Sequence, residues 1–112
     1  MILYSVTVNI DPAIHDEWLS WMKEVHVPEV LATGCFSSNK ILKLLDPPQD
    51  GFTYSFQYIA PSMEKLKEYQ IHFAPALQAD HQQKYADKFD AIQPSFFEIT
   101  VAMAFSALPK PA

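Results

Sequence analysis

The order in which strand-like and helix-like patterns follow one another most constrains how this chain folds. Apolar residues alternate with polar ones over residues 2–10, and further strands are predicted over 35–45, 52–60 and 88–104. Helical spacing of apolar residues fills the gap between the first two strands and the gap between the last two. The predicted element order is therefore βαββαβ.

Two interleaved β-α-β units of this kind form the ferredoxin-like fold of the α+β class, a four-stranded antiparallel sheet with two helices on one face. A chain of 112 residues with 49% hydrophobic residues is long enough to bury one such core. We expect a single domain over residues 1–104. Residues 105–112, with Pro109 and Pro111, are predicted to form a flexible C-terminal tail.

Prolines divide both predicted helices. Pro28 has no N–H and disfavours helical angles at Val27, so the first helix is expected to break or kink near His26. A turn over residues 28–33 and a left-handed stop at Gly34 should follow. In the second helical region, Pro75 is predicted to separate two segments.

The two faces of the predicted sheet differ sharply in polarity. One face is apolar and is assigned to the helices: Ile2, Tyr4, Val6, Val8, Phe52, Tyr54, Phe56, Tyr58, Phe97, Ile99 and Val101. The opposite face is polar but poor in charge: Ser5, Thr7, Asn9, Thr53, Ser55, Gln57, Glu98 and Thr100. Because a water-exposed surface usually carries more charged residues, we predict a homodimer whose polar sheet faces stack into an α/β barrel. The alternative is a monomer with a Ser/Thr-rich solvent face.

Composition disfavours several classes of partner. Thirteen acidic against eight basic residues give a net charge of -5, which argues against binding to nucleic acid or anionic membranes. No apolar run approaches the roughly 20 residues of a membrane span, and no signal peptide is predicted. Cys35 is the single cysteine, so an internal disulfide is excluded and a cytoplasmic location is expected.

The segment from Trp18 to Gly34 contains the pattern His-x-Pro-x-x-x-Ala-Thr-Gly. Together with residues 1–8, Ala74-Pro75-Ala76-Leu77, His81 and Phe89, it resembles a family of small bacterial proteins, mainly from Bacteroidetes, built on a domain of unknown function. The resemblance covers about residues 1–100. It implies a ferredoxin-like fold of the dimeric α/β-barrel kind and no assigned activity.

A more distant similarity links Trp21 and His26-Val27-Pro28 to the Trp…His-x-Pro pattern of EthD-like proteins. The wider barrel superfamily includes cofactor-free monooxygenases, polyketide cyclases, mutarotases and muconolactone isomerases. This likeness is one of fold, and fold alone does not give function.

His26 and Glu98 are the candidate catalytic residues. At a helix C-terminus, His26 would be stabilised in its charged form by the helix dipole and could act as a general acid or base. It could equally cap a carbonyl freed by Pro28. Inside a barrel, desolvation would raise the pKa of Glu98 and make it a base, whereas at the rim it would be an ordinary surface charge.

Trp21, Tyr54, His72 and His81 are candidate ligand-binding residues. Trp21 could wall a pocket for a flat or sugar-like molecule, although indoles at helical spacing are also typical of a core. His72 and His81 lie nine residues apart and no Cys-x-x-Cys or His-Glu-x-x-His motif occurs, so neither a metal nor a cofactor is predicted.

Two functional hypotheses follow from these residues. The favoured one is an interaction or ligand-binding homodimer without catalysis, whose ligand would be a small organic molecule, because no acid–base set is clustered in the sequence. The alternative is a cofactor-free enzyme of the isomerase, cyclase or monooxygenase type, with His26 as general acid or base.

Overall fold

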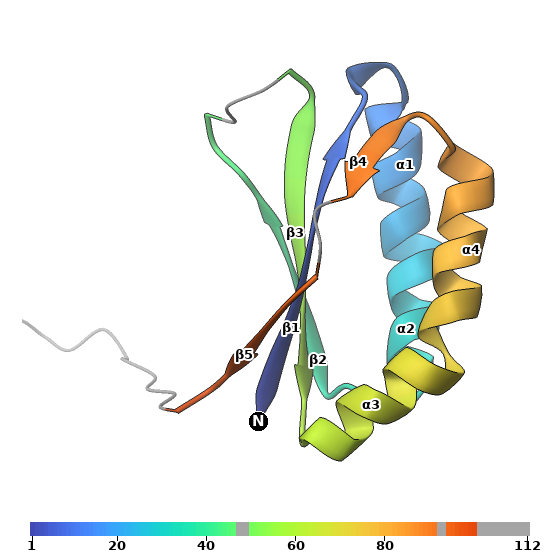
Figure 1. The fold of residues 1–112 in the computed structure, drawn as a ribbon. Coiled ribbons are helices and arrows are strands. Elements are labelled where there is room, and N and C mark those ends of the chain that lie inside the picture. The colour runs from blue at the N-terminus through green and yellow to red at the C-terminus, as the bar shows by residue number, and fades with distance from the viewer. Residues whose placement is uncertain (47–49, 92–93, 101–112) are drawn as a thin grey trace, which may run out of the picture.

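The computed structural model describes residues 1–46, 50–91 and 94–100 of the chain. Five antiparallel strands form one sheet: β1 (Ile2–Ile10), β2 (Ser38–Lys43), β3 (Phe52–Ala60), β4 (Phe89–Ala91) and β5 (Ser95–Glu98). The helices are α1 (His15–Trp21), α2 (Val27–Ala32), α3 (Met63–His72) and α4 (Ala74–Tyr85), and all four lie on one side of the sheet (Figure 1). No helix of the described residues is long and apolar enough to cross a membrane.

The strand order confirms the predicted ferredoxin-like fold. β1 is central: it pairs with β3 on one edge and with β4 and β5 on the other, while β2 pairs with β3. The predicted fourth strand is thus two short strands. The part of that strand predicted beyond residue 100, and the predicted tail at 105–112, lie outside the described residues.

The first helix does not break near His26, and the turn predicted over residues 28–33 is wrong. α1 continues through a π turn, Met22–His26, directly into α2, and the backbone of Val27 is helical (φ -62°, ψ -44°). In this wider turn the Val27 N–H bonds to the Met22 carbonyl, five residues back. Pro28 then enters at the start of α2, where its missing N–H costs little. Residues 28–32 are helical, and Gly34 ends the helix with φ +77° as predicted.

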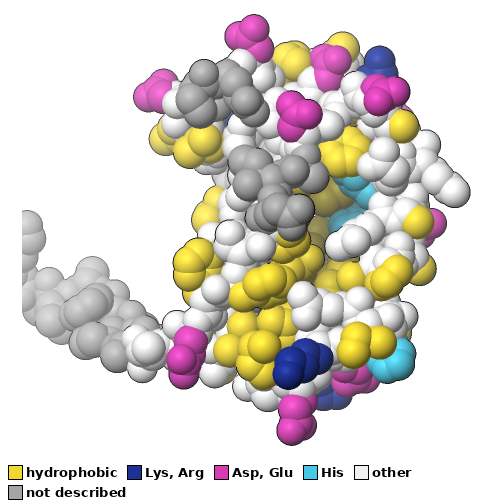
Figure 2. All heavy atoms as spheres, in the orientation of Figure 1, with side chains coloured by type: hydrophobic (Ala, Val, Ile, Leu, Met, Phe, Trp, Pro, Cys, Tyr) yellow, Lys and Arg dark blue, Asp and Glu magenta, His cyan; other side chains and the backbone are white. Residues whose placement is uncertain are grey.

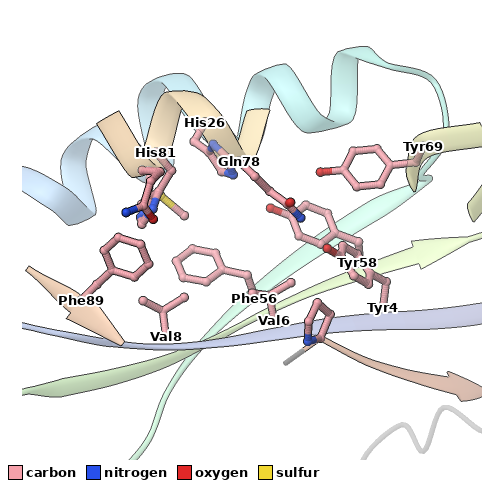
Figure 3. Close-up of a pocket in the computed structure, with 13 residues that line it drawn as sticks. Tyr4, Val6, Val8, His26, Phe56, Tyr58, Tyr69, Gln78, His81 and Phe89 are labelled. Carbon is pink, nitrogen blue, oxygen red and sulfur yellow. The ribbon is translucent and has the colours of Figure 1, made fainter. Parts of the chain in front are cut away.

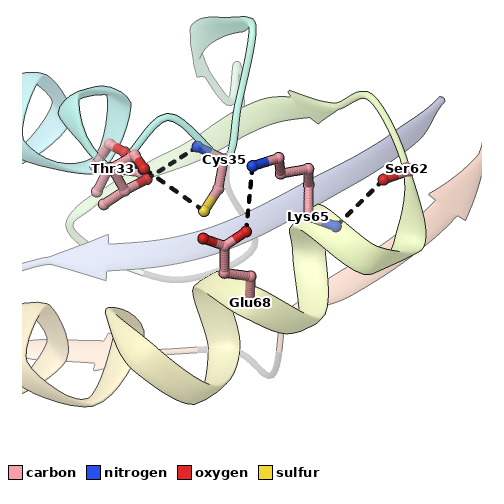
Figure 4. Close-up of polar contacts among 6 residues, drawn as sticks. Thr33, Cys35, Ser62, Lys65 and Glu68 are labelled. Carbon is pink, nitrogen blue, oxygen red and sulfur yellow. Dashed lines mark hydrogen bonds and ion pairs between the residues drawn. The ribbon is translucent and has the colours of Figure 1, made fainter.

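The second helical region is divided as predicted. α3 ends before Phe73, whose backbone angles (φ -122°, ψ -42°) are not helical, and Pro75 lies in the first turn of α4. The Ser62 hydroxyl caps α3 by accepting from the Lys65 N–H at 3.3 Å, and Lys65 pairs with Glu68 (Figure 4). Thr33 and Cys35 make the other polar contacts in that view, with the Cys35 side chain fully buried.

The sheet faces of β1 and β3 follow the prediction. Their apolar residues pack under the helices against Trp18, Met22, Leu66 and Tyr69. Their polar residues lie on the open face and bond across the strands. The Ser5 and Ser55 hydroxyls are 3.0 Å apart, and the Asn9 amide donates to the Thr53 hydroxyl at 3.0 Å.

The faces predicted for Phe97 and Glu98 are wrong. In β4, Phe89 pairs with Ile10, and regular antiparallel pairing from there would set Ser95 opposite Tyr4. In β5, Phe96 pairs with Tyr4 instead. The chain therefore has one extra residue between these two pairings. One extra residue reverses which side chains point to which face. Glu98 therefore shares the helix side with Ile2, and Phe97 shares the open face with Leu3.

Two glycines provide a matched test of this backbone. Both have positive φ, but a Cβ on Gly51 would lie 2.7 Å from the Ile10 carbonyl oxygen, whereas a Cβ on Gly34 would meet nothing within 4 Å. We expect Gly34→Ala to lower the free energy of unfolding by about 1 kcal/mol, the cost of a left-handed residue. Gly51→Ala should cost at least about 2 kcal/mol, because the strain and the steric clash add. Urea denaturation of both variants measures the difference, and equal losses would contradict the packing of Gly51 against β1.

Candidate functional site

A cavity of about 430 Å³ lies between the sheet and the helices. Val6 and Val8 line it from β1, and Gln78 and Gln82 line it from α4. In the space-filling view, a hollow between sheet and helices exposes hydrophobic and histidine side chains (Figure 2). The lining residues are Tyr4, Val6, Val8, Met22, His26, Phe56, Tyr58, Tyr69, Gln78, His81, Gln82, Phe89 and Pro94 (Figure 3).

The cavity is therefore not where a barrel interior would be. The sequence predicted a barrel interior on the polar face, between two stacked sheets. The cavity lies instead on the helix-covered face of the sheet. The open polar face remains a separate surface.

His26 is placed at the cavity by the π turn. It is the last residue of that turn, half-buried, with its ring centroid 5.4 Å from that of Trp21 and 6.1 Å from that of His81. Burial lowers the pKa of His26, and the nearby Asp80 carboxylate opposes this only in part. The expected stabilisation of a charged His26 by a helix end is wrong, because the helix continues through α2 and no C-terminal dipole lies at this residue.

His81 faces the same cavity from α4 and is buried. The Trp18 indole N–H donates to His81 Nε2 at 2.9 Å, and the ring of Phe89 lies 4.4 Å away in an edge-to-face arrangement. Burial, and secondarily the neighbouring His26, lower the pKa of His81 to about 4. At neutral pH His81 is an uncharged imidazole, and since Nε2 accepts a hydrogen bond, the ring proton resides on Nδ1.

Three tyrosines form the other end of the cavity. The ring of Tyr4 lies 6.0 Å from that of Tyr58 and 5.8 Å from that of Tyr69. Burial raises the pKa of all three phenols, although a hydrogen bond from Gln78 partly offsets this for Tyr4. Their hydroxyls therefore stay protonated at neutral pH and are available as hydrogen-bond donors.

The other predicted site residues lie away from the cavity lining. Trp21 packs against His26 and His81 from behind. The Tyr54 hydroxyl bonds to His15 Nε2 at 2.6 Å, outside the cavity. His72 is exposed at the end of α3, beside a separate shallow depression, and Glu98 is exposed in β5. Of the six predicted residues, the structure brings only His26 and His81 together in the cavity wall.

Sequence reasoning missed several lining residues. Tyr4 and Tyr58 were assigned to the core from their alternation, and nothing in the pattern distinguishes a core tyrosine from one at a cavity. Tyr69 and Gln78 lie on opposite sides of the helix break at Phe73, so their approach depends on the angle between α3 and α4. Among the described residues, no group of three or more His, Cys, Asp or Glu side chains is placed to hold a metal ion.

The architecture defines the class: an α+β protein with a ferredoxin-like fold. The chain belongs to the family described as a domain of unknown function, DUF4286, whose model matches residues 1–99. This agrees with the resemblance to a domain-of-unknown-function family seen in the sequence. No curated protein matches the chain.

Solved structures of low sequence identity share the fold. An EthD-family protein from Bacillus halodurans is 12% identical, with a TM-score of 0.64 over 89% of this chain and 100% of its own. HapK from Hahella chejuensis is 9% identical, with a TM-score of 0.69 over 95% and 100%. A dimeric ferredoxin-like protein from an uncultured marine organism is 13% identical, with a TM-score of 0.69 over 94% and 100%. At such identities the likeness is one of fold alone.

The lowered pKa of His81 predicts acid lability. Between pH 6.5 and 4 the unfolded chain binds a proton at this residue that the folded chain does not, so stability is complete above this range and falls with pH inside it. We expect the free energy of unfolding to drop by about 2 kcal/mol from His81 between pH 7 and pH 5, with His26 acting in the same direction.

Urea denaturation at the two pH values measures this loss. The control is His81→Gln, whose amide oxygen still accepts from Trp18 but does not titrate. Its stability should depend less steeply on pH than that of the wild type, and identical slopes would show that His81 is not a buried neutral imidazole.

Proposed function

We propose that this protein binds a small, uncharged organic molecule in the cavity between its sheet and helices. The observation that supports this most directly is the cavity itself. Its volume of about 430 Å³ lies in the usual range of ligand pockets, and its walls combine aromatic and aliphatic side chains with a few polar groups.

The residues that line the cavity also indicate that its ligand is uncharged. Among the described residues that line the cavity, none is Lys, Arg, Asp or Glu, and the lowered pKa values of His26 and His81 leave both imidazoles neutral at pH 7. Burying an ion without a partner of opposite charge is costly. An uncharged ligand is therefore the better fit.

A second candidate function is cofactor-free proton transfer within the same cavity. Its support is that His26 is a neutral imidazole, ready to accept a proton, in a space that also contains protonated tyrosine hydroxyls and the His81 N–H. Such donors could stabilise an oxyanion formed when His26 removes a proton from a bound ketone. The predicted role of His26 as general acid or base belongs to this candidate.

We further propose that two copies pair through the open sheet face. That face is polar but carries little charge, and it includes the exposed apolar side chains Leu42 (40% exposed) and Phe97 (54% exposed). Neutral hydroxyl and amide groups can bond to the same groups of a second copy, and the two apolar side chains gain by leaving water. A ferredoxin-like structure of similar fold is described as dimeric.

The binding proposal is tested with N-phenyl-1-naphthylamine, an uncharged dye whose fluorescence rises in apolar surroundings. Val6→Trp fills the cavity and should weaken binding at least about tenfold. The matched control Val25→Trp adds an indole on the exposed side of the first helix and should not change binding. Equal affinities of the two variants would exclude the cavity as the binding site.

The same system tests the charge of the ligand and the second candidate. An anionic relative, 1-anilinonaphthalene-8-sulfonate, should bind more weakly than the uncharged dye. Exchange of the methyl protons of bound 2-acetonaphthone with D₂O, faster with wild type than with His26→Phe, would favour proton transfer. Exchange at the rate seen without protein would favour binding alone.

The dimer is tested by light scattering at micromolar concentration, where we expect twice the chain mass of 12.8 kDa. Ser55→Glu places a charge in the middle of the open face and should shift the mass toward that of the monomer. Ser20→Glu, the same change on exposed helix surface, should leave the dimer intact. A monomeric wild-type protein would contradict the pairing.

A further inference from the structure

The polar groups of the cavity are separated in space. His81, His26 and Phe89 lie toward one end and Tyr58, Tyr69 and Tyr4 toward the other, with Gln78 between them on the helix side (Figure 3). A ligand that fills the space therefore meets imidazoles at one end and phenols at the other.

At the imidazole end, Trp18 fixes what His81 can offer. Because the indole N–H occupies Nε2, the nitrogen left for a ligand is Nδ1, which carries the proton and can only donate. Trp18 is itself fully buried, and its ring packs edge-on against Phe56 with centroids 5.7 Å apart, so this hydrogen bond is held in place. Trp18 thus acts as a positioning residue for His81.

His26 complements His81. A neutral imidazole has one nitrogen that accepts a hydrogen bond. Both rings line the cavity and their centroids are 6.1 Å apart, so one oxygen atom placed beside the pair can reach a nitrogen of each ring. A ligand hydroxyl is the group that both accepts and donates: it can accept from His81 Nδ1–H and donate to His26.

The phenol end offers the opposite chemistry. Tyr58 and Tyr69 are buried and protonated, so each can donate its O–H to an acceptor. A carbonyl oxygen has two lone pairs and can accept from both hydroxyls without bringing a charge into the cavity.

Between the two ends, the surfaces that a ligand meets are apolar. Val6, Val8 and Phe56 of the sheet form one wall, and Met22 contributes to the opposite side. Such walls favour a flat ring system that excludes water over its whole length.

We propose that the ligand is an aromatic ketone or quinone that also carries a hydroxyl group. Its hydroxyl lies between His26 and His81, its ring system packs between the apolar walls, and its carbonyl accepts from Tyr58 and Tyr69. This assignment rests on the binding function proposed above and goes further by naming the chemical class and the orientation of the ligand.

Four naphthalenes of similar size separate the contributions by calorimetric titration: naphthalene, 2-naphthol, 2-acetonaphthone and 6-hydroxy-2-acetonaphthone. Each hydrogen-bonding group should improve affinity about three- to tenfold, so the hydroxyketone should bind most tightly and naphthalene least. If naphthalene binds as well as the hydroxyketone, the cavity is an apolar site and the ligand class is wrong, while the binding function stands. If none of the four binds, the binding function itself fails for molecules of this size.

Single substitutions test the orientation by a crossed pattern. Tyr58→Phe removes one hydroxyl and should weaken 2-acetonaphthone about three- to tenfold without affecting 2-naphthol. His26→Phe keeps a ring but no nitrogen and should do the reverse. Tyr54→Phe, a hydroxyl outside the cavity, should change neither affinity. If Tyr58→Phe and His26→Phe weaken both probes equally, the two ends of the cavity do not bind different groups of the ligand, and the proposed orientation is wrong.

Trp18 has its own readout. Trp18→Phe removes the donor to His81 Nε2, so the proton of His81 is free to move between the two nitrogens. We expect the nitrogen chemical shifts of His81 in NMR spectra to change from a single Nδ1–H tautomer to a mixture, with a loss of 2-naphthol affinity. An unchanged tautomer would show that Trp18 does not position His81.

Discussion

The pairing of β1 with β3 is the constraint on which the rest of the structure depends. Nine consecutive residue pairs align most apolar residues of both strands on one face, and the hydroxyl and amide side chains, together with Leu3 and Ile59, on the other. The apolar face has to be covered, and α1 to α4 cover it (Figure 1). The same alignment sets Tyr4 beside Tyr58, and Val6 beside Phe56, so the sheet wall of the cavity is a consequence of register rather than of any separate motif.

The helix side of the cavity depends on two departures from regular helix geometry. The π turn at Met22–His26 lets the helix continue past Pro28 and leaves His26 in its interior, facing the cavity. The break at Phe73 separates α3 from α4, so that Tyr69 and Gln78 approach the same space from different helices. π turns often occur at functional sites, because the extra residue redirects side chains that a regular helix would bury elsewhere.

The hydrogen bond between Trp18 and His81 joins the first helix to the last one across the core. Trp18 is completely buried, and its indole N–H needs a partner, which His81 supplies. In return the imidazole is held neutral in a buried position. A single interaction therefore links the packing of the core to the protonation state of the cavity wall.

The sequence by itself determined the element order, the two faces of β1 and β3 and the division of the second helix at Pro75, because all of these follow from local period and from proline geometry. The sequence could not show that the first helix continues past Pro28, because a π turn is recognised only from hydrogen bonds between residues five apart. It also could not determine the faces of Phe97 and Glu98, because one added residue between β4 and β5 reverses the alternation. The cavity depended wholly on tertiary structure: its walls come from strands and helices far apart in the chain, and the protonation of His26 and His81 follows from the burial that their packing creates.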